Sequence, residues 1–346
     1  MGRALSGAGA VRALPGLLGR RVSLRHRIDD PGTPATLTDA VGEITEVDPG
    51  SVVVDTRSGP VRVATEAVVA VREIPPARPR RPSWAAVTRL ETICADGWPA
   101  PADRPLGQWR LRAAGGFTGR ANSCLAVGDP GRPVADALSK VRSFAAAHGV
   151  PARVQVPEGS PWHSSIGESG WHPDEHHGAG WRVEVLVSGI TKLALSDIHR
   201  IPGVSKITVE DRSRWSVAAV EAPRESSKAF AQAQEYVLTA PELPEVGFAL
   251  AHGGQPGDPP AGPVGYVRLA VVDDHLYVTR LGVAEQYRRR GLATALMTTA
   301  HAWGHERGAR WCVLQVADHN TAALALYRRL GFTAHHRYVY LRPPPG

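Results

Sequence analysis

The chain has 346 residues, with 40 Lys+Arg against 33 Asp+Glu and a formal net charge of +7. Its length predicts two or three domains, and its composition is that of a folded globular protein. No apolar run approaches the roughly 20 residues of a membrane-spanning helix, so no membrane partner is expected. The positive charge is dispersed apart from short basic runs at 78–81 and 288–290, which disfavours nucleic acid as a partner.

Three cysteines indicate the redox compartment. Cys94, Cys124 and Cys312 share no C-x-x-C spacing, and each lies in an apolar segment. We therefore expect buried free thiols in a reducing cytoplasm.

The N-terminal part predicts a small all-β module. Residues 1–19 are rich in Ala, Gly and Leu and are expected to form a disordered tail. Short β-rich runs follow at 21–28, 41–47, 52–56, 61–64 and 68–74. Five strands within residues 20–76 predict an SH3-like β-barrel with a structural or oligomerisation role, so a homo-oligomer stays open. The proline-rich residues 77–82 predict a stiff linker.

Residues 83–200 and 201–346 predict two related halves. Each shows a strand, a turn, a helix with a glycine stop and further strands. The elements are expected at 134–148, 152–156 and 182–187 in the first half and at 291–307, 310–316 and 338–341 in the second. The matching order predicts an α/β (α+β) fold with a mixed sheet, built from tandem lobes. The first turn, Asp129–Pro133, contains two prolines that remove backbone donors, so we expect the first half to be degenerate.

Two loops of the first half carry polar side chains. One holds His172, Asp174, Glu175, His176 and His177, with His163 nearby. Because a zinc site needs convergent ligands, which this Gly- and Pro-bounded loop does not suggest, no metal site is predicted. The other loop, 115–123, contains Arg120, which could bind an acceptor carboxylate or could belong to an ordinary surface turn.

The most informative stretch is Leu276–Phe332. Residues 275–283 predict a mostly buried strand, in which Gly282 suggests a bulge or a close backbone approach. A bulge would separate the strand from its neighbour. Three arginines and Gly291 then precede a helix. Because the first turn of a helix has unpaired N–H groups and a positive dipole end, this turn predicts a pyrophosphate site.

A second pattern lies downstream. Asn320 stands where it could cap the helix 321–330, and Tyr327 lies one turn before the Gly331 stop. Capping and core packing are their simplest roles.

Together the patterns R-x-x-G-x-A (Arg288, Gly291, Ala293) and N-x6-Y-x3-G-F (Asn320, Tyr327, Gly331, Phe332) resemble the GNAT-type N-acetyltransferase superfamily. A small β-barrel followed by tandem lobes resembles an actinobacterial subfamily of it. The resemblance implies acetyl-CoA as cosubstrate, held through its pyrophosphate by Arg288, Arg289, Arg290, Gly291, Leu292 and Ala293. It also implies that Leu281 and Val283 pair with pantetheine, and that Asn320 contacts the cofactor arm. Two residues are implied to be catalytic, because the Val283 N–H would polarise the thioester carbonyl and Tyr327 would protonate the departing thiolate.

The resemblance leaves the general base and the acceptor open. Many relatives carry a glutamate on the central strand. Here the candidates are Tyr277, Thr279 and Arg280, with Asp273, Asp274 and His275 just before them, or a water chain. The implied acceptor is a small-molecule primary amine such as the α-amine of glutamate; a protein lysine or N-terminal amine is the second alternative. A non-catalytic CoA-binding sensor is the alternative of another class.

Overall fold

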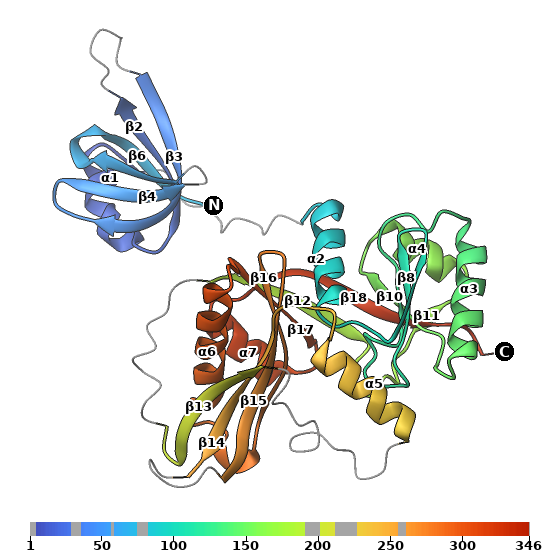
Figure 1. The fold of residues 1–346 in the computed structure, drawn as a ribbon. Coiled ribbons are helices and arrows are strands. Elements are labelled where there is room, and N and C mark those ends of the chain that lie inside the picture. The colour runs from blue at the N-terminus through green and yellow to red at the C-terminus, as the bar shows by residue number, and fades with distance from the viewer. Residues whose placement is uncertain are drawn as a thin grey trace. The chain divides into compact units, whose positions relative to one another are not determined.

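The computed structural model describes residues 5–28, 36–56, 59–74, 82–190, 201–211, 227–254 and 261–345. They belong to two compact units, residues 1–80 and 81–346 (Figure 1). Of the expected linker 77–82, only residue 82 lies within the described residues. No helix of the described chain is long and apolar enough to cross a membrane.

The first unit is a small antiparallel sheet. Its strands are β1 (Leu5–Ser6), β2 (Arg21–Ile28), β3 (Thr36–Val47), β4 (Ser51–Thr56), β5 (Gly59–Ala64) and β6 (Val68–Glu73). They pair in the order β1-β6-β2-β3-β4-β5, and no pairing among the described strands joins β5 to β1. The expected strands are thus present, whereas the closure of a barrel is not seen in this part of the chain.

The expected disordered tail is wrong for residues 5–19. Strand β1 pairs with β6, helix α1 (Ala8–Ala13) follows, and a 3-10 turn covers Leu14–Leu17. Ala10 and Leu14 are fully buried in the core of this unit. The apolar residues that suggested a featureless tail therefore cover the sheet, because burying their surface stabilises the ordered form.

The second unit contains a 12-stranded mixed sheet and six helices within its described residues. The elements of its first half are α2 (Trp84–Asp96), β7 (Ala102–Leu106), β8 (Trp109–Ala113), β9 (Cys124–Leu125), α3 (Val134–Ala147), β10 (Val154–Pro157), α4 (Pro161–Glu168), β11 (His172–Pro173) and β12 (Arg182–Gly189). Those of its second half are β13 (Val204–Asp211), α5 (Lys228–Thr239), β14 (Val246–Gly253), β15 (Ala261–Val272), β16 (His275–Val283), α6 (Leu292–Glu306), β17 (Trp311–Ala317), α7 (Thr321–Arg329) and β18 (Thr333–Arg342).

The two halves exchange their last strands. The sheet order is β13-β14-β15-β16-β17-β12-β18-β10-β9-β8-β7, so β12 of the first half lies between β17 and β18 of the second. Strand β18 in turn pairs with β10 of the first half. The central order β9-β10-β18-β12-β17-β16 repeats the same pairings from either end, with parallel pairs outside and antiparallel pairs inside. The internal repeat therefore forms one fused sheet (Figure 1).

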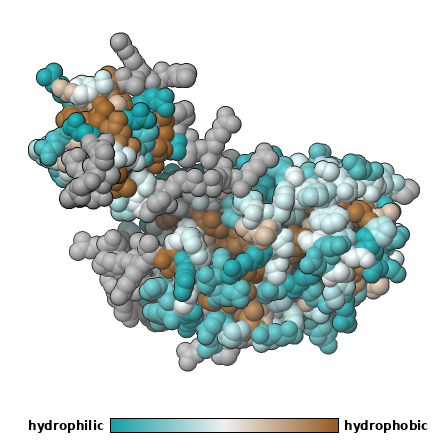
Figure 2. Space-filling view, turned by 90° about the horizontal axis from the view of Figure 1, so that it is seen from above, coloured by the Kyte–Doolittle hydropathy of each residue, from teal (hydrophilic) through white to brown (hydrophobic). Residues whose placement is uncertain are grey.

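The two faces of this sheet pack against different helices. On one face Leu276, Val278 and Leu314 pack with residues of α6 and α7. On the other face Tyr277 and Val313 pack with residues of α2 and α5. The alternation follows from the two-residue period of a strand. The view in Figure 2 shows hydrophobic residues at the surface between hydrophilic ones.

All three cysteines are buried and unpaired, as expected from the sequence. Burial raises the pKa of the Cys124 thiol to about 12, despite the opposing charge of Arg112. The thiol is therefore neutral and inert at neutral pH.

We expect Leu186→Ala to lower the stability of the whole second unit. Leu186 lies on β12 of the first half, yet it is 1% exposed in the core of the second half. Truncating a buried leucine costs about 2–5 kcal/mol. All 9 tryptophans follow residue 80, so their fluorescence during urea unfolding reports on this unit alone. We expect one cooperative transition, shifted to lower urea.

The matched control is Leu37→Ala, whose side chain is 52% exposed in the first unit and which should leave that transition in place. Two separate tryptophan transitions, or an unchanged midpoint for Leu186→Ala, would contradict the interdependence of the halves.

Candidate active site

Strands β16 and β17 separate partway along their length. Their parallel pairing runs from His275 opposite Trp311 to Val278 opposite Leu314, and then ends. Strand β16 continues to Val283 against β15 alone. The stretch that contains Leu281 and Val283 thus borders a gap in the sheet, where a ligand could meet unpaired backbone groups.

A bulge in β16 accompanies this separation, as the sequence predicted, but its position differs. The register shifts opposite Tyr266 and Arg268, and Arg280 adopts a left-handed φ of 58°. Gly282 serves another purpose, because a Cβ there would come within 2.6 Å of the Tyr266 ring. The bulge therefore centres near Arg280, and the glycine permits close packing.

The arginine turn leads into a pocket at the start of α6. Gly291 precedes the helix with a φ of 85°, and a Cβ built there meets no atom within 4 Å. A cavity of about 350 Å³ opens at this point. It is lined by Val283, Tyr287, Arg288, Arg289, Gly291, Leu292, Ala293, Thr294, Ala322, Leu326 and Arg329. The end of β16, the turn, the first turn of α6 and one face of α7 thus surround a cationic cavity.

The turn is tied to the strand that it follows. Arg288 donates from Nε to the carbonyl oxygen of Val283 over 3.1 Å. The Arg290 guanidinium instead lies over the Tyr287 ring, 5.6 Å from its centroid, and does not line the cavity. Two of the three adjacent arginines therefore face the pocket.

Leu281, Asn320 and Tyr327 also do not line the cavity. The Asn320 side chain accepts a hydrogen bond from the backbone N–H of Ala323 over 3.1 Å. It therefore caps α7, which is the simplest role that the sequence indicated for it.

Sequence reasoning missed the α7 face of the pocket. Ala322, Leu326 and Arg329 recur at i, i+4 and i+7, the spacing of one helical face. This spacing is present in the sequence, but it does not indicate whether that face of α7 borders a cavity or packs in the core.

Tyr327 is buried on the same side of the sheet as α6. Its side chain is 6% exposed and packs edge-on against Phe332, with ring centroids 5.6 Å apart. Burial raises the pKa of Tyr327, and the neighbouring Cys312 adds to the rise. The hydroxyl therefore keeps its proton at neutral pH. It donates to no residue within the described part of the chain.

The candidate bases separate into two groups. Asp273, Asp274 and His275 lie at the start of β16, where Asp274 contacts His275 Nδ1 over 2.8 Å. At about 3.3 Å per residue, His275 is roughly 13 Å along the strand from Thr279, the first residue beyond the paired stretch. Thr279 is 4% exposed, and its hydroxyl has no partner among the described residues.

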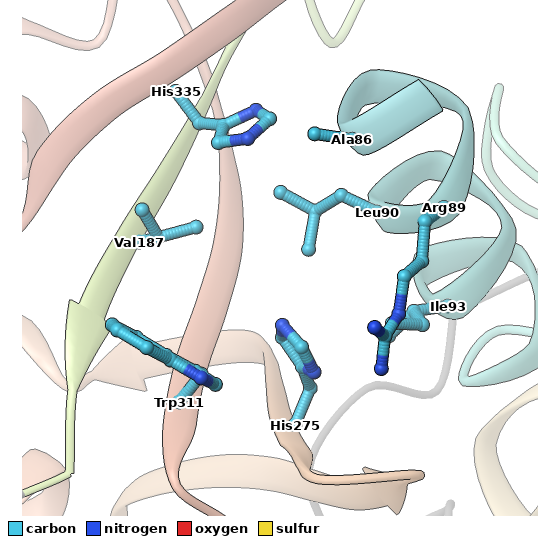
Figure 3. A pocket seen from close by; sticks show the side chains of 8 residues that line it. All are labelled: Ala86, Arg89, Leu90, Ile93, Val187, His275, Trp311 and His335. Atoms are coloured by element: carbon cyan, nitrogen blue, oxygen red, sulfur yellow. The ribbon is translucent and has the colours of Figure 1, made fainter. Parts of the chain in front are cut away.

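A second cavity lies near the opposite ends of β16 and β17. It measures about 260 Å³ and is lined by Ala86, Arg89, Leu90, Ile93, Val187, His275, Trp311 and His335. Figure 3 shows side chains of α2 facing those of the sheet across it. His335 contacts His336 over 2.8 Å between their Nδ1 atoms, and His336 reaches the buried Glu91 over 2.7 Å. Burial, together with His336, lowers the pKa of His335 to about 4.

Family models match both units of the chain. A family model described as "Probable histone acetyltransferase Rv0428c C-terminal" matches residues 85–341. A model described as "Rv0428c N-terminal Sm-like domain" matches residues 17–72, where the sequence had suggested an SH3-like barrel.

Individual proteins also match. The chain is 24% identical over 260 residues to the "Uncharacterized N-acetyltransferase YobR" of Bacillus subtilis, covering 73% of this chain and 97% of that protein. It is 40% identical over 112 residues to the "Probable histone acetyltransferase Rv0428c" of Mycobacterium tuberculosis, covering 32% of this chain and 35% of that one. A solved structure, the "GCN5-related N-acetyltransferase from Kribbella flavida", aligns with a TM-score of 0.49 at 19% identity, covering 75% and 96% of the two chains.

We expect the second unit to become less stable as the pH falls, over a pH range set by the pKa of His335. Its pKa is lowered from 6.5 to about 4 in the folded protein, so the unfolded chain binds the extra proton between these values. The stabilisation is fully present above pH 6.5 and is lost as the pH falls toward 4. Urea unfolding followed by tryptophan fluorescence should show a flatter pH dependence for His335→Gln than for the native chain.

The control is His176→Gln, which removes an exposed histidine and should keep the native pH dependence. Parallel pH profiles for the native chain and His335→Gln would exclude His335 as the source.

Proposed function

The chain belongs to the GNAT-type acetyltransferases, in the family described as "Probable histone acetyltransferase Rv0428c C-terminal", and on this premise we propose that it moves an acetyl group from acetyl-CoA to a primary amine. The observation that carries the proposal is the cationic cavity at the end of β16, in the stretch of that strand that continues beyond its last pair with β17. It is lined by three arginines, Arg288, Arg289 and Arg329, and by the first turn of α6.

The cavity fits the pyrophosphate of acetyl-CoA. Gly291 leaves open space where a side chain would stand, so phosphate oxygens can approach the N–H groups at the start of α6. Arg288 and Arg289 border the same cavity and can donate charge-assisted hydrogen bonds. Leu292 and Ala293 form the first helical turn. The gap beside Leu281 and Val283 would receive the pantetheine arm, and Asn320 would support that arm through its cap of α7.

Acetyl-CoA supplies the acetyl group as a thioester. The Val283 N–H, at the free end of β16, would donate to the carbonyl oxygen as negative charge develops there. The amine nitrogen forms a bond to the carbonyl carbon, the carbon–sulfur bond breaks, and a proton leaves the nitrogen. Tyr327, kept protonated by its burial, would give its proton to the departing thiolate and recover one from solvent.

The acceptor is proposed as a primary amine of a small molecule, with the α-amine of an amino acid such as glutamate as the first choice. The alternative is a protein lysine or N-terminal amine, in keeping with the name of the Mycobacterium tuberculosis relative. We place the reaction in the cytoplasm, on the grounds of the three buried free thiols. The N-terminal unit is assigned a structural or oligomerising role.

We expect thiol release from acetyl-CoA in the presence of a panel of primary amines. Tyr327→Phe should lower kcat by about 100- to 10,000-fold, the usual contribution of a general acid, without weakening acetyl-CoA binding. A colorimetric thiol assay gives the rate, and calorimetry gives the affinity for acetyl-CoA. The matched control is Tyr236→Phe on α5, whose hydroxyl donates to Glu242 over 3.2 Å outside the cavity.

Tight acetyl-CoA binding without amine-dependent thiol release would favour the sensor over the enzyme. Equal rates for the native chain and Tyr327→Phe would remove the tyrosine from the mechanism while leaving the transferase intact.

We expect Arg288→Gln and Arg289→Gln each to weaken acetyl-CoA binding by about 10- to 100-fold, the loss of a charge-assisted hydrogen bond. Arg290→Gln is the matched neighbour, and its effect should be clearly smaller because Arg290 faces Tyr287. Calorimetric titration with CoA checks all three variants. Equal losses at the three positions would support a turn in which every arginine contacts phosphate.

A further inference from the structure

An arginine of the first half reaches the separation of the strands in the second half. Arg120 lies in the loop between β8 and β9, far in sequence from both strands. Its Nη1 donates to the Tyr277 hydroxyl over 2.8 Å and to Gln315 Oε1 over 3.0 Å. The Tyr277 hydroxyl also donates to Gln315 Oε1 over 2.9 Å. Gln315 is the first residue of β17 beyond the last pair with β16, so the guanidinium stands at the gap.

Arg120 approaches from the face opposite to Tyr327. Tyr277 belongs to the core that contains α2 and α5, whereas Tyr327 belongs to the core that contains α6. Thr279, whose buried hydroxyl lacks a partner among the described residues, follows Tyr277 on the same face by strand alternation. The acetyl group would thus meet Tyr327 from one side and this polar group from the other.

The position of the guanidinium is fixed by its surroundings. It lies 5.2 Å from the ring centroid of Trp98 and 6.0 Å from that of Tyr277. The preceding Gly119 has no room for a side chain, because a Cβ there would collide with the His177 ring. That ring packs on Tyr340 with centroids 4.8 Å apart. A side chain held in this way is preorganised for a ligand.

Arg120 lacks a counter-charge within the described residues. Two arginines of the first half that do form ion pairs are Arg153, which meets Asp174 over 2.7 Å, and Arg110, which meets both Asp96 and Asp103. No aspartate or glutamate of the described chain forms an ion pair with Arg120. A partly buried charge without a partner is costly, so such a group points to a ligand of opposite charge.

The unused edge of the guanidinium has the shape of a carboxylate site. Both hydrogen bonds of the side chain to described residues use Nη1. Nε and Nη2 donate to no described residue, and neither belongs to the buried atoms that lack a partner, in a side chain that is only partly buried. Two parallel N–H groups on one edge match the two oxygens of a carboxylate.

We propose that Arg120 binds a carboxylate of the acceptor, so that the substrate class is an amine that carries a carboxylate close to its nitrogen. The role of this carboxylate in the reaction rests on the proposed function, whereas its binding to Arg120 does not. It gives the degenerate half a direct part in choosing the acceptor. It also disfavours a lysine within a basic protein tail, because such a tail would bring further positive charge to Arg120.

The kinetic test compares α-amino acids with their α-amides as acceptors. The native chain should prefer the acids. Arg120→Gln should raise KM for the acids by about 10- to 100-fold and leave KM for the amides and the affinity for acetyl-CoA unchanged. Arg120→Lys, which keeps the charge but loses the two-pronged edge, should fall between. Arg132→Gln removes an exposed arginine of the same half and is the matched control.

A binding test needs no turnover. With saturating CoA, glutarate and N-acetyl amino acids should raise the thermal midpoint of the native chain and of Arg132→Gln, but not that of Arg120→Gln. The thermal midpoint without additive shows whether each variant is folded. If Arg120→Gln does not fold, Arg120→Lys takes its place in this test.

The outcomes separate the two proposals. No turnover with any amine would remove the proposed function, while carboxylate stabilisation lost with Arg120 would still support the site. Equal losses for acids and amides, or stabilisation by carboxylates that survives in the Arg120 variants, would overturn the inference. Absence of carboxylate stabilisation in the native chain would overturn it as well.

Discussion

The antiparallel pairing of β12 with β18 is the contact on which the second unit depends. Each strand ends one half of the unit, and each also lies against a strand of the other half. Without β12, the edge of β17 would be bare, and unpaired strand edges in a protein interior are costly. The first half is therefore structurally necessary, even though its own turn at Asp129–Pro133 does not suit phosphate.

The same pairing explains where the site opens. Strand β17 is held by β12 along its whole length, whereas β16 is held by β15. Each strand thus follows a different neighbour, and the two separate once their short parallel pairing ends at Val278 and Leu314. The gap is a consequence of sheet topology, and the bulge at Arg280 directs the end of β16 toward the arginine turn.

The two faces of the gap have different chemistry. The face of α6 and α7 offers Arg288, Arg289 and the buried Tyr327, which suits a phosphorylated donor and a leaving thiolate. The opposite face offers Arg120, Tyr277 and other polar groups drawn from both halves. The proposed function would divide donor and acceptor between these two faces, and the period of two along β16 and β17 sends alternate side chains to opposite faces.

Much of the second half could be predicted because its signals are local. The strand 275–283 agrees with β16, and the helices expected at 291–307 and 321–330 match α6 and α7 closely. Apolar periodicity, glycine stops and the cap at Asn320 all act within a few residues, so the sequence carries them directly. The Sm-like family match was not visible in this way. Neither was the order of residues 5–19, because a short Ala/Gly/Leu segment is helical or disordered according to what it packs against.

The sequence by itself determined the repeat, the arginine turn and the order of strands and helices around it. The tertiary structure alone decided that the halves exchange strands, that Arg289 faces the cavity while its neighbour Arg290 turns to Tyr287, and that Arg120 meets Tyr277 across 157 residues of chain. Backbone preference and periodicity are set by neighbours in sequence. Which side chains share a cavity is set by packing between segments that are distant along the chain, and no local pattern encodes that choice.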